Sequence, residues 1–208
     1  MKAWNRHMGT EGVTLIELFV AMIIAGILIA MGLPSFLGLI QRSSINAGSR
    51  QIMYEIRAVQ NLAVTRGGVF GFHWGGDPLA ALPLSQYRII RDTTGACGFP
   101  APTAPQDGTN VVRTWFDLAG EYPGMRIQSV RDHNGTALGG VMFNSRGASV
   151  NTCAVPAPTF PVWVCVSDGA GTNRVIQIQR AGRAMVVDPL NPPVPPPAPW
   201  PPPPNVCL

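Results

Sequence analysis

An uninterrupted apolar segment near the N-terminus constrains this chain more than any other feature. Residues 18–40, LFVAMIIAGILIAMGLPSFLGLI, are 23 residues without one ionisable side chain. Counted from Val13 the segment has 28 residues, or about 42 Å of helix against a hydrocarbon core of about 30 Å. A secretory signal has a shorter apolar core and ends at small residues. We therefore expect a membrane-spanning helix rather than a conventional cleaved signal.

Two residues are unusual for a simple anchor. Glu17 lies at the front of the segment, where an acidic side chain costs about 2.5–3.5 kcal/mol on insertion scales and requires a partner. Pro34 removes a backbone donor and clashes with the preceding turn, which predicts a kink or local melting of the helix over residues 30–34.

The run Gly12-Val13-Thr14-Leu15-Ile16-Glu17, with Pro34 further along the apolar helix, resembles the class III signal of type IV pilins and type II secretion pseudopilins. The resemblance implies that a prepilin peptidase cleaves between Gly12 and Val13 and methylates the amine of Val13. Val13 departs from the phenylalanine that most members carry there. Lys2 and Arg6 of the leader fit the cytoplasmic side of the membrane.

The same resemblance supplies a partner for Glu17. It implies that this carboxylate meets the N-terminal amine of Val13 in a neighbouring subunit, so that two charges neutralise each other in a helical bundle. The alternative is a glutamate at the level of the lipid headgroups without a role.

The helical pattern continues beyond the apolar segment. One apolar stripe recurs at intervals of three, four or seven residues: Ile45, Ile52, Ile56, Val59 and Ala63. Charged residues fall between them: Arg42, Arg50, Glu55, Arg57 and Arg66. Gly67-Gly68 ends the pattern. The prediction is a helix of about 50 residues whose second half packs on a globular head and whose basic residues face solvent.

The remaining sequence reads as short β-branched or aromatic runs bounded by turn residues. The predicted strands are 69–74, 87–91, 111–116, 125–130, 141–144, 160–167 and 174–179. Residues 175–179 alternate apolar and polar side chains, and residues 167–173 give a hairpin signal before them. The fold class is therefore α+β, with a long helix covering an antiparallel sheet.

Three segments of the head, in this order, resemble the GspH/FimT branch of minor pilins and pseudopilins: Phe143-Asn144-Ser145-Arg146-Gly147, Trp163-Val164-Cys165-Val166, and Arg174-Val175-Ile176-Gln177-Ile178 with Gly182-Arg183. Some members of that branch take up DNA and carry a Gly-Arg-x-Arg motif. Met185 replaces the second arginine here. Arg174, Arg180 and Arg183 are the candidate DNA contacts, with ordinary solvated arginines as the favoured alternative.

All four cysteines, Cys97, Cys153, Cys165 and Cys207, follow the apolar segment, as expected for an exported, oxidised head. Three pairings are possible. The favoured one joins Cys153 to Cys165 through a short loop and Cys97 to Cys207. The cysteines have no C-x-x-C spacing and no adjacent histidine, so no metal site is expected.

The C-terminal tail, residues 188–208, holds 11 of the 21 prolines. We expect an extended polyproline rod, either a spacer or a docking segment with Trp200 as its anchor. After loss of the leader, His73 and His133 are the remaining histidines, and no catalytic or phosphate-binding motif is present. Neither an enzyme nor a cofactor is expected.

These observations predict five segments: leader 1–12, membrane or filament-core helix 13–40, amphipathic helix 41–67, β-rich periplasmic head 68–187 and tail 188–208. The expected function, from the resemblance, is that of a minor pilin that initiates or caps a type IV pilus for motility, adhesion or DNA uptake. The alternative is a minor pseudopilin of a type II secretion system. The expected partners are the prepilin peptidase, other pilins or pseudopilins and the inner membrane, and the expected locations are that membrane and then a filament at the cell surface.

Overall fold

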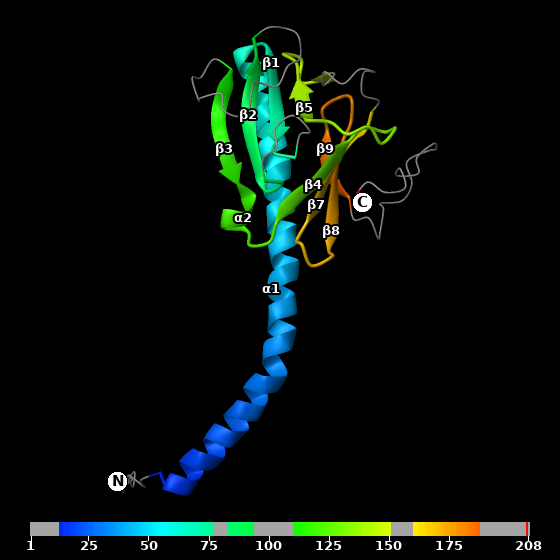
Figure 1. The fold of residues 1–208 in the computed structure, drawn as a ribbon. Helices are drawn as coiled ribbons and strands as arrows, with labels where there is room; N and C mark the ends of the chain where they lie inside the picture. The colour runs from blue at the N-terminus through cyan, green and yellow to red at the C-terminus, as the bar shows by residue number, and fades with distance from the viewer. Residues whose placement is uncertain (1–12, 77–82, 94–109, 151–159, 188–206, 208) are drawn as a thin grey trace, which may run out of the picture. The chain divides into compact units, whose positions relative to one another are not determined.

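The described residues form an α+β protein in which one long helix is followed by two antiparallel sheets (Figure 1). The computed structural model describes residues 13–76, 83–93, 110–150, 160–187 and 207. The chain divides into two compact units, Met1–Ile40 and Gln41–Leu208. The predicted fold class is confirmed.

Helix α1 runs from Leu15 to Arg66 and is 52 residues long. It ends where predicted, because Gly67 has a φ of 63°, a left-handed conformation that glycine adopts without the clash of a Cβ. In the first unit, the stretch Leu15–Gly32 has a mean hydropathy of 2.5, and none of it is buried within the protein. By length and composition, this stretch could cross a membrane.

Pro34 does not interrupt α1. The sequence predicts a kink or local melting over residues 30–34. The helix is continuous through this position, so the prediction of local melting is wrong, and a kink stays a prediction. A proline removes one backbone hydrogen bond, and the bonds of the turns on either side remain available to hold the helix together.

Sheet A has the strand order β3-β2-β1-β5-β6, and sheet B has the order β4-β7-β8-β9. The bounds in sheet A are β1 Val69–Trp74, β2 Gln86–Asp92, β3 Val111–Asp117, β5 Gly140–Phe143 and β6 Ser149–Val150. Those in sheet B are β4 Arg126–Arg131, β7 Val162–Ser167, β8 Asn173–Ile178 and β9 Ala184–Val187. All seven predicted strands are present, with ends shifted by at most two residues. Helix α2, Leu118–Glu121, and strands β6 and β9, which are two to four residues long, were not predicted.

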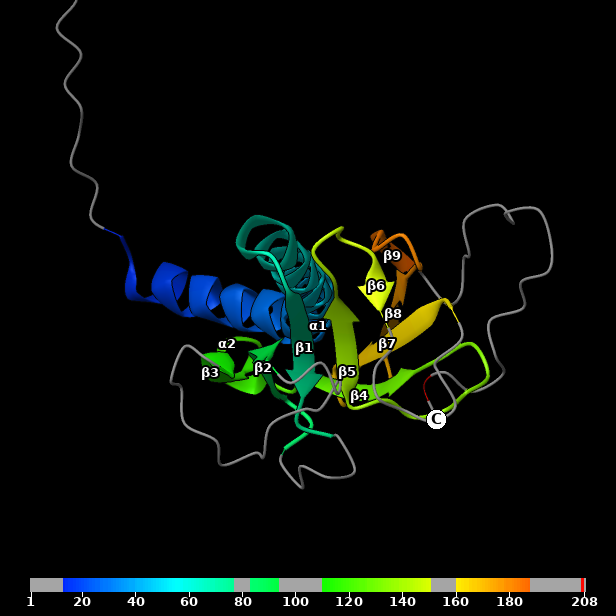
Figure 2. The same cartoon turned by 90° about the horizontal axis from the view of Figure 1, so that it is seen from above.

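One hydrophobic core joins the second half of α1 to both sheets (Figure 2). The predicted stripe is confirmed, since Ile45, Ile52, Ile56, Val59 and Ala63 are all fully buried. Two backbone hydrogen bonds also link a strand of one sheet to a loop beside the other sheet. Ile127 N donates to Leu84 O at 2.9 Å, and Ser149 N donates to Arg180 O at 3.0 Å.

Both predicted disulfide pairs are wrong. Cys165 is bonded to Cys207, with their Cα atoms 5.5 Å apart, so the pairs Cys153–Cys165 and Cys97–Cys207 are both excluded. Side chains alternate along β7, and Cys165 therefore belongs with Trp163 and Val175 to a small cluster separate from the main core, where Cys207 packs. The direction of the side chain, rather than the shortness of a loop, decides the pairing. Cys97 and Cys153 lie outside the described residues.

Candidate functional site

The start of α1 is held by a reciprocal capping box between Thr14 and Glu17. Glu17 N donates to Thr14 Oγ1 at 3.4 Å. In return, Thr14 N and Thr14 Oγ1 donate to Glu17 Oε2 at 3.0 Å and 2.9 Å. This is the Thr-x-x-Glu arrangement that satisfies backbone donors which have no partner within the helix. Thr14 is not among the predicted site residues, although the Thr-x-x-Glu signature could have identified it.

The capping box engages one oxygen of Glu17 and leaves the other available. Both Thr14 donors reach Oε2, and Oε1 accepts no hydrogen bond from any described residue. The side chain is exposed. The arrangement therefore orients a carboxylate at the beginning of an apolar helix and leaves one oxygen free for an external donor.

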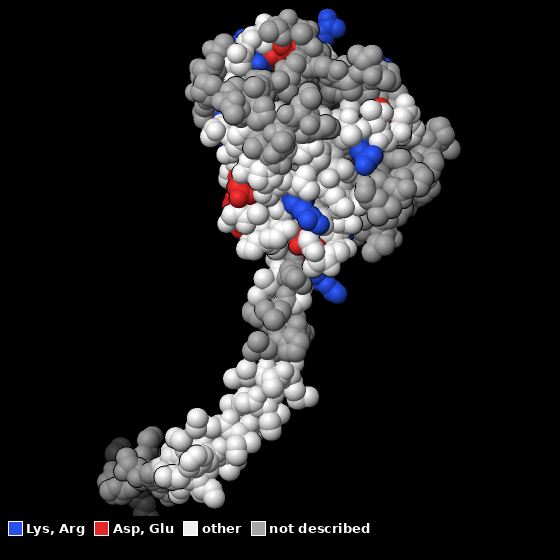
Figure 3. Space-filling view, viewed as in Figure 1, with Lys and Arg blue, Asp and Glu red and all other residues white. Residues whose placement is uncertain are grey.

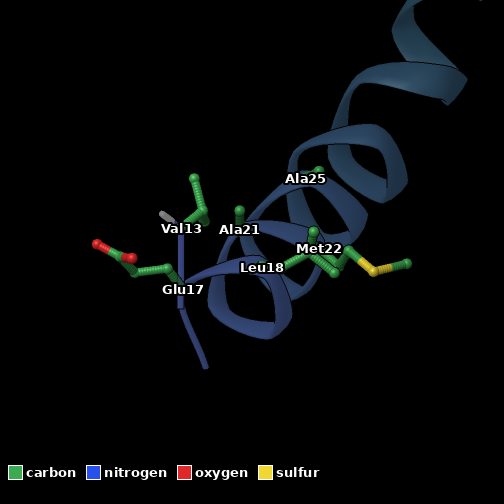
Figure 4. A pocket seen from close by; sticks show the side chains of 6 residues that line it. All are labelled: Val13, Glu17, Leu18, Ala21, Met22 and Ala25. Carbon is green, nitrogen blue, oxygen red and sulfur yellow. The ribbon is translucent and has the colours of Figure 1, made fainter. Parts of the chain in front are cut away.

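A shallow open groove begins beside Glu17 (Figure 4). Glu17, Ala21 and Ala25 are spaced four residues apart and so follow one helix face, and Val13, Leu18 and Met22 complete the lining. Short alanine side chains let a second helix approach closely in a membrane or bundle. The groove therefore suits an apolar helix, with the carboxylate of Glu17 at its end.

The other side chains described in this unit are also mostly apolar and are uncovered within the protein. The large apolar ones among them, including Leu15, Ile16, Phe19 and Met31, are between 49% and 76% exposed. Soluble proteins rarely expose an apolar surface of this extent, which requires lipid or other helices around it. Gly12 lies outside the described residues, and the side chain of Pro34 is likewise not described.

The three arginines that are candidate DNA contacts, Arg174, Arg180 and Arg183, do not lie together in the structure. Arg174 lies near the start of β8, where its Nε donates to Asn46 Oδ1 at 3.2 Å. Arg180 and Arg183 lie beyond the other end of that strand, about 20 Å away at roughly 3.3 Å per residue. On the face shown in Figure 3, the arginines of the described residues are separated from one another and form no patch.

A buried polar cluster joins α1 to the edge of sheet A. Glu55, expected among the exposed residues, is only 8% exposed. Its Oε2 forms an ion pair with Arg113 Nη2 at 2.5 Å, and its Oε1 accepts from Gln51 Nε2 at 3.1 Å. Burial, and then the nearby Glu55 carboxylate, raise the pKa of Tyr87 well above its ordinary value. The cluster holds α1 against sheet A, and none of its residues lines the groove at the start of α1.

His73 is buried within sheet A and hydrogen-bonded to an arginine of the neighbouring strand. His73 is 1% exposed, and its Nδ1 accepts a hydrogen bond from Arg88 Nε at 3.0 Å. No group of three or more His, Cys, Asp or Glu residues in the described ranges could hold a metal ion.

No protein-family model matches the sequence, and no curated protein sequence matches it. Solved structures that match part of this chain include the type IV minor pilin FimU of Pseudomonas aeruginosa. That comparison has 13% identity and a TM-score of 0.46, and covers 73% of this chain and 94% of FimU. A second crystal form of FimU gives 13% identity, coverage of 71% and 96%, and a TM-score of 0.43. The minor pseudopilin EpsH of Vibrio cholerae gives 12% identity, coverage of 70% and 98%, and a TM-score of 0.43.

Proposed function

We propose that this chain is a minor pilin-like structural subunit of a type IV pilus and that it acts by assembly rather than by catalysis. The observation that carries the proposal is the capped, apolar and uncovered start of α1, directly after the Gly12-Val13 sequence that resembles a prepilin cleavage site. The position of the subunit is at the initiating end or tip of the filament. Function as a minor pseudopilin is the alternative.

The first step of this function is processing. A prepilin peptidase removes residues 1–12, and Val13 then carries a free, methylated amine one residue before Thr14. Residues 13–40 hold the chain in the inner membrane, and residues 68–187 form the head in the periplasm. The new amine is a cation at the end of an apolar helix, where a neighbouring carboxylate stabilises it.

The second step is docking between subunits. Oε1 of Glu17 accepts a hydrogen bond from the Val13 amine of the adjacent subunit. Thr14 keeps the carboxylate oriented through its hydrogen bonds to Oε2. The groove along Glu17, Ala21 and Ala25 receives the apolar helix of that neighbour. Burial of both charges in a helical bundle makes the pair interdependent, since either charge alone would be costly in that environment.

Processing is tested by the intact mass and N-terminal sequence of the protein from its native membrane, with and without the prepilin peptidase. We expect peptidase-dependent loss of residues 1–12 and a methylated Val13. The Gly12→Ala variant should keep its leader in cells that contain the peptidase. A retained leader in the unaltered protein, or a cut near Ala30, would leave an ordinary anchored protein and end the proposal.

Docking is tested with Glu17→Gln, which keeps the shape of the side chain and removes its charge. We expect normal cleavage and membrane insertion but at least tenfold less protein in sheared filaments. The matched control is Glu121→Gln, a change at an exposed acidic residue of α2. Equal incorporation of the two variants would contradict the pairing of Glu17 with a neighbouring amine.

A further inference from the structure

Two turns of the head meet over the second half of α1. One turn, residues 144–148, joins β5 to β6, and the other, residues 179–183, joins β8 to β9. Gln60 Nε2 of α1 donates to Gly147 O at 2.7 Å. A Cβ added to Gly182 would lie 2.2 Å from Gly147 O and 2.3 Å from Gln60 Nε2. The two turns are therefore in close contact with each other and with the Gln60 side chain of the helix, and together they form one support.

This support carries exposed arginines. Arg146 belongs to the first turn, and Arg180 and Arg183 belong to the second. Arg57 lies on α1, and its Nη2 donates a hydrogen bond at 3.2 Å to the backbone oxygen of Ala184, the first residue of β9. Within residues 41–66, 144–150 and 178–187, Glu55 is the one acidic residue, and it is buried and paired elsewhere. The positive charge has no acidic counterpart on these segments.

Exposed apolar side chains lie on the same elements. Beyond residue 40, the described residues include four exposed large hydrophobic side chains: Tyr54, Val64, Leu84 and Val186. All of them except Leu84 lie on α1 or β9. Tyr54 precedes Arg57 by three residues and Val64 follows it by seven, so all three follow one face of α1. The Cγ2 of Val64 is 3.2 Å from a Cβ placed on Gly147. Val186 lies on the same face of β9 as Ala184.

We propose that these four arginines, together with Tyr54, Val64 and Val186, form a docking surface for an acidic segment of a partner protein that also presents apolar side chains. We call it the α1–β9 surface. Charge complementarity requires an anionic partner. Arginine and tyrosine are enriched at protein interfaces and dominate their binding energy. A nucleic acid backbone would be bound mainly through charge, and the interleaved apolar side chains therefore favour a protein.

This surface lies in the second unit and goes beyond the proposed pairing at Glu17. It requires neither cleavage at Gly12 nor the groove at the start of α1, so it applies equally to a subunit that waits in the membrane. A failure of Glu17→Gln to affect assembly would leave the inference intact.

The test uses the full chain in its native cells with the photoreactive residue p-benzoylphenylalanine in place of Tyr54. After irradiation, mass spectrometry of the digested adduct identifies the crosslinked peptide. We expect a peptide of another protein with a clear excess of Asp and Glu over Lys and Arg. Combining the probe with Arg146→Glu and Arg183→Glu should lower the adduct yield at least tenfold, because the change replaces attraction with repulsion.

The matched control is Arg126→Glu, at an exposed arginine on β4, the opposite edge strand of sheet B. It also makes the net charge more negative, and it should leave the adduct yield within twofold of that of the probe alone. The double variant Arg146→Gln and Arg183→Gln, which removes the two charges without reversing them, should give an intermediate adduct yield. It keeps the test valid if the charge-reversed double variant misfolds. A crosslinked peptide without acidic excess, a yield insensitive to Arg146 and Arg183, an adduct with nucleic acid, or no adduct would each overturn the inference.

Discussion

Replacement of Gly182 by alanine tests the contact between the two turns most directly. Gly182 has a φ of 84°, a conformation that costs an L-residue about 1–2 kcal/mol. The added methyl would also overlap Gly147 O at 2.2 Å and Gln60 Nε2 at 2.3 Å. Because one of these atoms belongs to the backbone, the turns must separate, and rotation of a side chain cannot relieve the overlap.

The chain offers a matched control in Gly135. Its φ is 85°, it follows the same kind of turn, and an added Cβ meets nothing within 4 Å. The conformational cost is therefore common to both variants and cancels in their difference. Two costs are then specific to Gly182→Ala. They are the loss of the hydrogen bond from Gln60 to Gly147, about 1 kcal/mol, and the overpacking around the added methyl, about 1–3 kcal/mol.

We therefore expect Gly135→Ala to lower the free energy of unfolding by about 1 kcal/mol. Gly182→Ala should lower it by about 3 kcal/mol more. Urea unfolding of the full chain in detergent, followed by tryptophan fluorescence, measures both values, and equal m-values would show that the unfolded states are comparable. If the two variants agree within about 0.5 kcal/mol, the close contact of the turns is not what holds this region together.

Three further predictions concern the head. Arg113→Gln should destabilise it by about 2 kcal/mol in urea unfolding, since it leaves the Glu55 carboxylate buried without its cation, and adding Glu55→Gln should recover at least half of the loss. Tyr87→Phe should flatten the loss of stability above pH 10. The folded state keeps Tyr87 protonated there while the unfolded state loses the proton, so the wild-type protein should lose about 1.4 kcal/mol more per pH unit than the variant. Replacing both Cys165 and Cys207 by alanine should lower the free energy of unfolding by up to about 4 kcal/mol under oxidising conditions, given the separation of 42 residues between them. An unchanged unfolding midpoint for the arginine or cysteine variants would contradict the contact concerned. For Tyr87→Phe, the contradicting result is the same dependence of stability on pH as in the wild-type protein.

Local patterns in the sequence determined the elements of this protein. The uncharged stretch before Gln41 requires a helix in an apolar environment, because a backbone there must satisfy its own hydrogen bonds. The spacing from Ile45 to Ala63 specifies which helix face is buried. The β-branched runs bounded by turn residues locate seven of the nine strands that the described residues form. Each signal depends on residues a few positions apart, so a single sequence is sufficient to read it. The Thr14–Glu17 capping box was equally local and was overlooked.

The tertiary structure alone decided how those elements meet. Periodicity does not state which strands pair, so the division into two sheets and the joining of Cys165 to Cys207 could not be read from spacing. The burial of Glu55 follows from an arginine 58 positions later on β3, and the surface around Arg57 arises from turns that lie far apart in the chain. Such contacts bring together groups distant in sequence, and their free energy depends on complementary packing that no local pattern encodes.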